Sequence, residues 1–238
     1  MALENRTAVI AGASGGLGQV VAHDLASRGT NLALLERDDA KLAALRSRLA
    51  FPPARVLTQA VDLLVPEQVQ RAAEVVSAHF GHVDILVHLV GGWTGGKTLL
   101  EAEPGELDSM LKQHVWTSFN VVRAFLPHLI RNGWGRILMV TSPFGTQPAA
   151  KGGPYAMAKA AQEALVLTLA QELKGTGVTA NLLQAKTIDL QREKVAKPSR
   201  DNLAWSTPEE LSAAMMYLLS EEAGGVSGAK LPMFGPSR

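Results

Sequence analysis

The chain has 238 residues, of which 47% are hydrophobic and 19% are charged, and its formal net charge is +1. This balance is typical of a globular protein with a sizeable core, and it excludes a largely disordered chain. A net charge so close to zero argues against nucleic acid or an anionic membrane as the main partner. The sequence contains no cysteine, which excludes disulfides and thiolate metal sites and fits a reducing compartment.

The same reasoning gives an expectation for the location of the protein. Residues 1–6 do not combine a basic region with a long apolar run, so we expect no secretory signal. No apolar stretch approaches the ~20 residues that span a bilayer. We therefore expect a soluble, cytoplasmic protein that has neither a nucleic-acid partner nor a membrane partner.

Short apolar runs alternate with longer helix-like segments along the chain. The apolar runs predict strands at residues 7–11, 31–35, 55–61, 84–90, 136–141, 178–183 and 229–233. The longer segments predict helices at residues 16–28, 38–49, 66–80, 107–130 (one or two helices, ending near Pro127), 154–173 and 207–220. The last helix carries a clear start signal, with Thr207 as the cap, Pro208 in the first turn and Glu210 at the capping-box position.

Continuous apolar strands that alternate with helices predict a parallel sheet covered on both faces. About seven strands fit one doubly wound α/β domain of the Rossmann type, which we expect to span residues 1–238. Residues 187–206 form an irregular stretch that is too long for an ordinary connection in a compact domain. A stretch of this length is usually a functional lid or disordered, and we expect a substrate lid.

A glycine cluster follows the first predicted strand and opens the first predicted helix. Glycines allow a tight turn and let backbone N–H groups approach a pyrophosphate at the partly positive helix N-terminus. A tight turn without a ligand would use the same residues, but the strand, helix and second strand that follow in order favour a dinucleotide. The residues of this turn that we expect to bind the cofactor are Gly12, Ser14, Gly15, Gly16, Leu17 and Gly18.

The end of the second predicted strand bears on the choice between NAD and NADP. Glu36 is placed to accept hydrogen bonds from both hydroxyls of the adenosine ribose, which favours NAD. Arg37 is placed to pair with the additional phosphate of NADP. The two residues indicate opposite choices, and we favour NAD while NADP stays open. After the third strand, Asp62 is placed either to bind adenine or to serve as a turn residue, and its neighbour Leu63 is expected in the same site.

Tyr155 and Lys159 are four residues apart in a predicted helix and therefore share one face. An ammonium beside a phenol favours the phenolate, so we expect the Tyr155 pKa to fall from a reference near ~10 towards neutrality. Tyr155 would then act as a general acid and base in hydride transfer, and Lys159 would also bind the nicotinamide ribose. Ser142 follows a strand and would hydrogen-bond the substrate oxygen, whereas the side chain of Thr141 is expected to point the other way.

With these residues in place, the chain resembles the short-chain dehydrogenase/reductase family over nearly its whole length. The separation of Ser142 from Tyr155 matches the family's usual spacing, and residues 227–231 resemble the family's last strand. The resemblance implies NAD(P)-dependent reduction of a carbonyl or imine, or oxidation of the matching alcohol, and assembly into a homotetramer or dimer. The residues that carry the resemblance are Gly12, Gly16, Gly18, Asp62, Asp84, Ser142, Tyr155 and Lys159.

Within the family there is a local likeness to dihydropteridine reductases and to bacterial oxidoreductases with a Gly-Gly-Trp loop. Ser142 departs from dihydropteridine reductase, which lacks this serine, and the likeness does not fix the substrate. A 3-oxoacyl-carrier-protein or quinone reductase therefore stays open, as does a non-catalytic dinucleotide-binding sensor or scaffold. The short segments that carry the likeness are residues 91–96, 112–118, 155–159, 187–189 and 205–208.

The chain departs from the family pattern at three places. Residues 88–91 read His-Leu-Val-Gly where the family usually has Asn-Asn-Ala-Gly, and residues 185–186 read Ala-Lys where it usually has Pro-Gly. His114 aligns with the family's active-site asparagine. It would pass protons to Lys159, or it is a satisfied buried histidine. We expect His88 to be a structural core residue.

Several further residues are expected around the nicotinamide and the substrate. Val90 and Gly91 follow the fourth strand and are expected to contact the cofactor, and Thr187 is expected near the carboxamide. Trp93 would form a flat wall for a ring substrate, or it packs against the lid. Lys186 would attract an anion, or it is an ordinary exposed lysine. The six histidines show no ligand spacing, so we expect no metal site.

Overall fold

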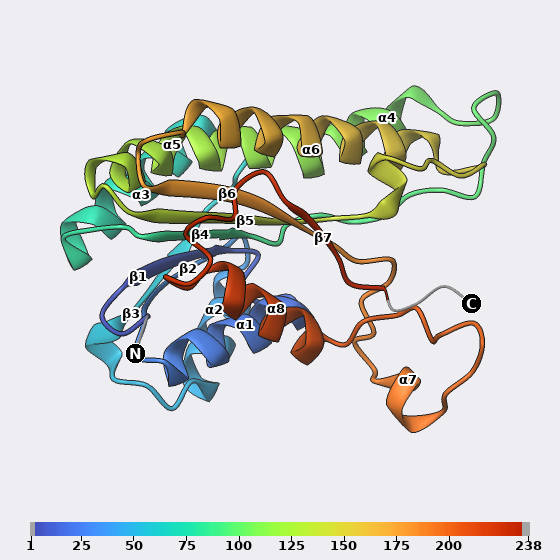
Figure 1. Cartoon of the computed structure of the whole chain (residues 1–238). Helices are drawn as coiled ribbons and strands as arrows, with labels where there is room; N and C mark the ends of the chain where they lie inside the picture. Colours follow the sequence, from blue (N-terminus) through green and yellow to red (C-terminus); the bar gives the residue numbers. More distant parts are fainter. Residues whose placement is uncertain (1–2, 235–238) are drawn as a thin grey trace.

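The computed structural model describes residues 3–234, and its centre is a seven-stranded sheet between two layers of helices (Figure 1). Neighbouring strands are all parallel, in the order β3-β2-β1-β4-β5-β6-β7. The strands are β1 (Thr7–Ala11), β2 (Asn31–Glu36), β3 (Val56–Ala60), β4 (Ile85–His88), β5 (Gly135–Thr141), β6 (Val178–Gln184) and β7 (Lys230–Pro232). The predicted doubly wound, Rossmann-type sheet is confirmed.

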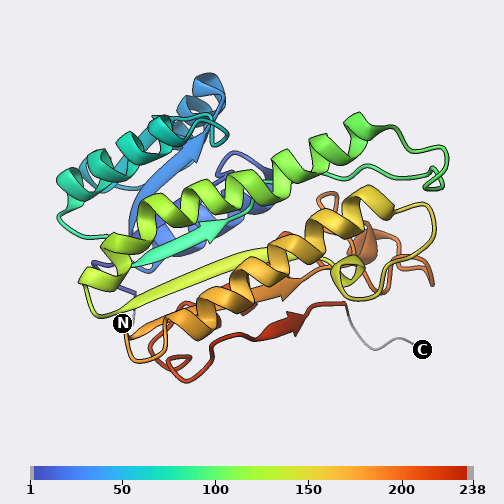
Figure 2. The same cartoon turned by 90° about the horizontal axis from the view of Figure 1, so that it is seen from above.

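Helices cover both faces of the sheet. The long helices are α1 (Gly16–Ser27), α2 (Asp39–Arg48), α3 (Pro66–Phe80), α4 (Pro104–Leu111), α5 (Thr117–Arg131), α6 (Gly153–Glu172) and α8 (Pro208–Leu218). The short ones are η1 (Pro53–Arg55), η2 (Lys112–Trp116), η3 (Pro143–Gly145) and α7 (Glu193–Ala196). Helices α3, α5 and α6 lie side by side on one face (Figure 2), and α1, α2 and α8 lie on the other. Within residues 3–234, no helix has both the length and the apolar character needed to cross a membrane.

The core has two halves, one on each face of the sheet. Phe125 of α5 and Val166 of α6 are fully buried in one half, and Leu25 of α1 and Met215 of α8 are fully buried in the other. Every residue of β1, β4 and β6 is buried. Because side chains alternate between the two faces of a strand, burial on both faces produces the unbroken apolar runs of the sequence. Burial of each large apolar side chain stabilises the folded state by about 1.5–3 kcal/mol compared with leaving that side chain exposed.

The helical region predicted at residues 107–130 differs from the prediction at its start and in its middle. It begins at Pro104, because Glu103 and Glu106 form a reciprocal capping box with the first backbone N–H groups. A wider turn with π-type bonds, η2, then joins α4 to α5 without a break in the chain direction. Wide helical turns of this kind are frequent at functional sites, and η2 contains His114.

The expected end of this region near Pro127 is wrong. Helix α5 continues through Pro127 to Arg131. A proline inside a helix loses one hydrogen bond and strains the preceding turn. Here the fully buried side chains on either side, Phe125 and Leu129, hold the helix against the sheet and outweigh that local cost.

The order of the strands determines where a ligand can bind. β1 has β2 on one side and β4 on the other, so the direction of winding reverses between β1 and β4. Ala11 at the end of β1 is paired with His88 at the end of β4. In open parallel sheets, ligands bind outside the carboxyl ends of the strands at such a reversal. The glycine turn and the loop after β4 therefore flank one crevice.

Residues 187–206, predicted as a lid, extend beyond the carboxyl ends of the strands (Figure 1). The segment is closed by a bridge between Ile188 and Ser206. It contains the short helix α7, and the buried carboxylate of Asp189 accepts hydrogen bonds from the backbone N–H groups of Glu193 and Lys194 at 2.9 and 2.8 Å. The segment is thus folded by its own hydrogen bonds.

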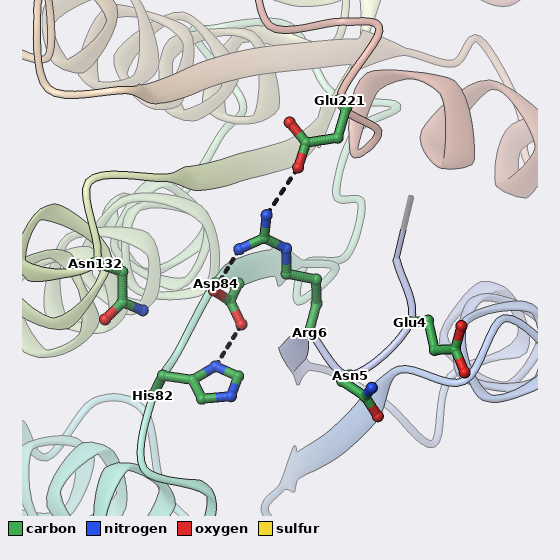
Figure 3. Close-up of a pocket in the computed structure, with 7 residues that line it drawn as sticks. All are labelled: Glu4, Asn5, Arg6, His82, Asp84, Asn132 and Glu221. Atoms are coloured by element: carbon green, nitrogen blue, oxygen red, sulfur yellow. Dashed lines mark hydrogen bonds and ion pairs between the residues drawn. The ribbon is translucent and has the colours of Figure 1, made fainter. Parts of the chain in front are cut away.

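A polar cluster lies at the opposite, amino ends of the strands (Figure 3). Arg6 pairs with Asp84 at 3.2 Å and with Glu221 at 2.7 Å. The buried Asp84 carboxylate also accepts the backbone N–H of Thr7 at 2.7 Å and lies 2.6 Å from His82 Nδ1. The cluster lines a hollow of about 620 Å³ bounded by Glu4, Asn5, Arg6, His82, Asp84, Asn132 and Glu221. The ion pairs of this cluster connect the start of β1 with the start of β4 and with the segment after α8.

Candidate active site

A cavity of about 750 Å³ opens at the carboxyl ends of the central strands. Its volume is typical of a small-molecule or cofactor site. Most predicted site residues line it: Gly12, Gly15, Gly16, Leu17, Gly18, Val90, Gly91, Trp93, His114, Ser142, Tyr155, Lys159 and Thr187. The predicted cofactor residues outside its lining are Ser14, Glu36, Arg37, Asp62 and Leu63. Among the residues that the structure describes, none in the lining is acidic, so the cavity suits an anionic ligand.

The glycine turn is shaped to receive a bulky anion at the start of α1. Gly12 has a φ of 82°, and a Cβ on Gly18 would overlap the Gly12 carbonyl oxygen. The cap residue Gly15 offers no side-chain hydrogen bond to the first turn, which also holds no acidic residue. The backbone N–H groups at this helix start are therefore available to a pyrophosphate, as in dinucleotide-binding proteins. The residues present fit this part of the cofactor.

Glu36 lies at the end of β2 beside the glycine turn. The Ser14 hydroxyl donates to its Oε2 at 2.5 Å, and the Arg37 backbone N–H donates to its Oε1 at 2.8 Å. These two contacts fix the orientation of the carboxylate. Asp62 Oδ1 accepts a hydrogen bond from the Leu64 backbone N–H at 2.9 Å, so this oxygen stabilises the turn after β3.

Ser142, Tyr155 and Lys159 meet at the floor of the cavity. Ser142 follows β5 and caps η3, where its Oγ accepts the Phe144 N–H at 3.4 Å. The Tyr155 ring packs edge-on against the Phe144 ring, with the ring centres 5.7 Å apart. Lys159 Nζ lies 5.8 Å from the centre of the Tyr155 ring. The structure therefore brings the three residues together, although β5 and α6 contribute them from separate parts of the chain.

Lys159 is buried and its ammonium is held by two neutral oxygens. Its Nζ donates to the Val140 carbonyl and to Gln162 Oε1, both at 2.9 Å. The Gln162 amide in turn donates to Ser118 Oγ at 2.9 Å, and that hydroxyl donates to the His114 carbonyl at 2.6 Å. Sequence reasoning did not identify Gln162; its position three residues after Lys159, on the same face of α6, was the available signal.

Burial sets the pKa values of the catalytic pair. It lowers the pKa of Lys159 to about 7, against the opposing effect of the Glu163 carboxylate. Burial also raises the pKa of Tyr155, although a hydrogen bond with Ser142 partly lowers it. The expected fall of the Tyr155 pKa is therefore wrong for this structure. Loss of hydration dominates at the phenol, and the Lys159 amine is directed to Val140 and Gln162 instead.

The two histidines near the site are buried and neutral. His114 Nε2 donates to the Gly92 carbonyl at 2.8 Å, and burial lowers the His114 pKa to about 4. His88 Nε2 contacts Thr117 Oγ1 at 3.3 Å, and burial lowers the His88 pKa to about 3. Within residues 3–234, the Nδ1 atoms of both rings have no hydrogen-bond partner.

Sequence reasoning missed the apolar residues that complete the wall. Phe144, Ile188 and Leu190 line the cavity, and a Cβ on Gly16 would lie 2.5 Å from Leu190 Cδ2. Residues 187–206 thus reach back over the glycine turn. Trp93 lines the rim with 63% of its surface exposed. Within the described part of the chain, no three or more His, Asp or Glu residues are grouped as metal ligands.

Comparisons with known proteins agree with this geometry. A family model for short chain dehydrogenases matches residues 6–200. The uncharacterized oxidoreductase YmfI of Bacillus subtilis is 30% identical over 97% of this chain and 98% of its own. An NADPH-bound short chain oxidoreductase from Pseudomonas aeruginosa PAO1, which contains an atypical catalytic center, has a TM-score of 0.89 and 26% identity. The match covers 100% of this chain and 98% of that chain.

A second solved structure extends the comparison to a relative with a named substrate. It is a 3-ketoacyl-(acyl-carrier-protein) reductase from Brucella melitensis complexed with NADH, with a TM-score of 0.86 and 26% identity. The match covers 96% of each chain. The family match, the parallel sheet and the glycine turn at its reversal point lead to one conclusion: this chain is an oxidoreductase that belongs to the short-chain dehydrogenase/reductase family.

Proposed function

We propose that this protein is an NAD(P)-dependent reductase of a small carbonyl or imine compound, with Tyr155 as the proton donor. The observation that carries the proposal is the single cavity that Ser142, Tyr155 and Lys159 share with the glycine turn. Hydride transfer needs a bound dinucleotide, a polarised acceptor and a proton source within reach of one another. This cavity holds side chains suited to each of these tasks.

The chain's own residues divide the remaining work. The bound dinucleotide supplies or accepts the hydride. In reduction, Ser142 donates a hydrogen bond to the substrate oxygen, and the Tyr155 hydroxyl gives its proton to that oxygen as negative charge develops there. A phenol whose pKa is raised by burial holds its proton at neutral pH, which suits the donor role. Lys159, with a pKa of about 7, is poised to return a proton to Tyr155 and to hydrogen-bond the nicotinamide ribose.

We propose NAD as the preferred cofactor. The supporting contact is the hydrogen bond from Ser14 to Glu36, which holds a carboxylate at the end of β2 beside the glycine turn. A fixed carboxylate there would accept hydrogen bonds from ribose hydroxyls and repel the additional phosphate of NADP. Arg37, exposed and adjacent, is the competing influence that keeps NADP as the alternative. Both cofactors occur among the relatives, because the Pseudomonas structure holds NADPH and the Brucella structure holds NADH.

The cavity wall supports a flat or apolar substrate. Trp93 and Phe144 supply aromatic surface, and Lys186 places an exposed positive charge in the lining. These features, together with the local likeness to dihydropteridine reductases, favour a ring substrate that carries a carbonyl or imine. The Brucella relative favours a second candidate function, reduction of a 3-oxoacyl group on a carrier protein. A quinone reductase or a non-catalytic sensor would use the same dinucleotide site.

The proposal includes the organisation of the protein. Residues 1–238 act as one cytoplasmic domain with residues 187–206 as its substrate lid, and the chain forms a homotetramer or dimer. Exposed aromatic residues support pairing between copies: Trp116 of η2 is 54% exposed and Phe119 of α5 is 37% exposed. They lie in the helical region through which we expect the subunits to associate.

A substrate panel tests the proposed chemistry. Ketone, pterin and acyl substrates are assayed with NADH and with NADPH, using the wild type, Tyr155→Phe and the control Tyr217→Phe. Tyr217 is exposed on α8 and is not among the residues that line the cavity. We expect Tyr155→Phe to lose turnover and keep cofactor binding, while Tyr217→Phe behaves as the wild type. Equal turnover in all three proteins would refute Tyr155 as the proton donor.

A further inference from the structure

Glu163 is a buried carboxylate that the proposed mechanism does not use. It lies on α6, four residues after Lys159, and only 3% of its surface is exposed. A buried charge is costly unless it is paired and hydrogen-bonded. Its Oε1 accepts Thr141 Oγ1 at 2.9 Å, and its Oε2 accepts Lys230 Nζ at 3.1 Å. The pairing with Lys230 explains how the charge is tolerated in the core.

The partners of Glu163 come from three neighbouring strands, and one of them, Thr141, lines the cavity. Thr141 is the last residue of β5 and directly precedes Ser142. Gln184 is the last residue of β6, and its amide donates to Glu163 Oε1 at 3.4 Å. Lys230 is the first residue of β7. One carboxylate therefore connects three strands to the helix that carries Tyr155 and Lys159.

The turn after Ser142 also rests on this carboxylate. A Cβ on Gly145, the last residue of η3, would lie 2.7 Å from Glu163 Oε1. The turn can approach Glu163 so closely only because residue 145 is glycine. The position of the Ser142 hydroxyl is thus constrained from both directions, by Thr141 before it and by Gly145 after it.

The charges around Lys159 make Glu163 electrostatically important as well. Lys159 and Glu163 share one face of α6 and are both buried. The titratable groups facing Lys159 from other elements are His88 of β4 and His114 of η2, and both histidines are kept neutral by burial. The Glu163 carboxylate raises the pKa of Lys159 against the burial that lowers it.

Two further groups complete this charge environment. Tyr155, on the same helix, is neutral because burial raises its pKa. Lys230 lies on the other side of Glu163 and offsets part of the carboxylate's negative charge. The net attraction that Lys159 experiences is therefore set by Glu163 and moderated by Lys230.

We propose that Glu163 is a positioning residue: its carboxylate fixes the strand end that carries Ser142 and places a buried negative charge one helical turn from Lys159. The role in turnover rests on the function proposed above, whereas the charge effect on Lys159 is a property of the protein alone. The two halves of the inference can be tested separately.

The charge effect is tested by NMR titration of isotope-labelled lysine side chains, with Lys159→Met used to assign the Lys159 signal. Glu163→Gln removes the charge but keeps an acceptor for Thr141, and we expect the Lys159 midpoint to fall by on the order of one pH unit. Lys230→Met removes the moderating charge, so we expect the midpoint to rise. Glu172→Gln, an exposed change on the same helix, is the matched control and leaves the midpoint unchanged.

If Glu163 had only a structural role, Glu163→Gln and Lys230→Met would not shift the Lys159 titration midpoint in opposite directions. If Glu163→Gln folds poorly, the double variant Glu163→Gln with Lys230→Met removes both buried charges and still lacks the carboxylate. We expect a lower Lys159 midpoint than in Lys230→Met alone. Unchanged midpoints in all of these proteins would overturn the electrostatic half of the inference.

The positioning effect is tested by kinetics. Thr141→Val removes the hydrogen bond but keeps the charge, so we expect kcat to fall about tenfold while the Lys159 midpoint stays in place. Thr141→Ser restores the hydroxyl and is expected to recover kcat. An unchanged kcat in Thr141→Val would overturn the positioning half. If Tyr155→Phe instead turned over as well as the wild type, the proposed function would fail, while the lysine titration would still decide the link between Glu163 and Lys159.

Discussion

The amino and carboxyl ends of the sheet are both rich in polar side chains, yet they treat charge in different ways. At the amino ends, Arg6 forms ion pairs with both Asp84 and Glu221. At the carboxyl ends, the buried Lys159 is hydrogen-bonded to neutral oxygens, and burial lowers its pKa to about 7. Strongly perturbed groups in a cavity indicate function, whereas mutually neutralised groups indicate structure. The shifted pKa of Lys159 therefore distinguishes the two ends better than the number of polar residues does.

Lys159→Met is expected to have the largest effect and to separate activity from stability. We expect kcat/KM to fall by about 10² to 10⁴, because Tyr155 loses its proton source and the nicotinamide ribose loses a ligand. The free energy of unfolding should rise by on the order of 1 kcal/mol, because a buried ammonium is replaced by an apolar side chain. Steady-state kinetics and urea unfolding check the two outcomes. If Lys159→Met lost both activity and stability, Lys159 would be as important for the fold as the cluster at the amino ends, and the contrast between the two ends would not hold.

The stability difference between the wild type and Lys159→Met should depend on pH. The folded pKa of Lys159 is about 7, below its ordinary value of 10.5, so the unfolded chain binds more protons between these two values. The stability of the wild type relative to Lys159→Met should therefore rise as the pH increases through this window. Urea unfolding at several pH values checks the sign. If the difference in the free energy of unfolding between the two proteins did not change with pH, burial would not lower the pKa of Lys159.

Asp84→Ala is expected to give the opposite result at the amino ends. It leaves Arg6 without one partner and the Thr7 N–H without its acceptor, so the free energy of unfolding should fall by about 3 kcal/mol. The kcat of the folded protein should not change, because the cluster lies at the amino ends of the strands and the cavity lies at their carboxyl ends. Asp201→Ala, in an exposed position, serves as the control for loss of a carboxylate. Equal stability of the two variants would contradict a structural role for the cluster.

Glu36→Ala tests the adenosine side of the site. Removing the carboxylate held by Ser14 should narrow the preference for NADH over NADPH by about tenfold, because its hydrogen bonds and its repulsion of phosphate are both lost. The ratio of kcat/KM values for the two cofactors is the measurement. An unchanged ratio would show that Glu36 does not select the cofactor.

Trp93→Ala is expected to have the smallest effect. The ring is largely exposed at the rim, so its loss should raise KM for a ring substrate about threefold and leave kcat nearly unchanged. Leu100→Ala, at another exposed apolar residue, is the control. A large loss of kcat would instead place Trp93 at the reacting atoms.

Features set by local patterns were predictable from the sequence. Helix α3 runs from Pro66 to Phe80 as expected, since proline favours a helix start and Gly81 ends it with a φ of 80°. The capping box between Thr207 and Glu210 is also present as expected. The order of these local signals was enough to predict the parallel sheet, which the structure confirms.

Features that depend on contacts between distant segments were not predictable in the same way. Pro127 suggested a helix end because its cost is local, whereas the packing that offsets this cost comes from the sheet. The raised pKa of Tyr155 depends on how completely its neighbours exclude water, which spacing along one helix does not reveal. Glu163 was overlooked for the same reason, because its partners Thr141 and Lys230 come from two separate strands.

The contact between Leu190 and Gly16 has a consequence for how the cofactor enters. Leu190 packs against Gly16 at the start of α1, beside the backbone N–H groups at which we propose that the pyrophosphate binds. We therefore expect the side chain at position 190 to affect how tightly the dinucleotide binds. A lid residue that touches the glycine turn would thus link the substrate side of the cavity to the nucleotide side.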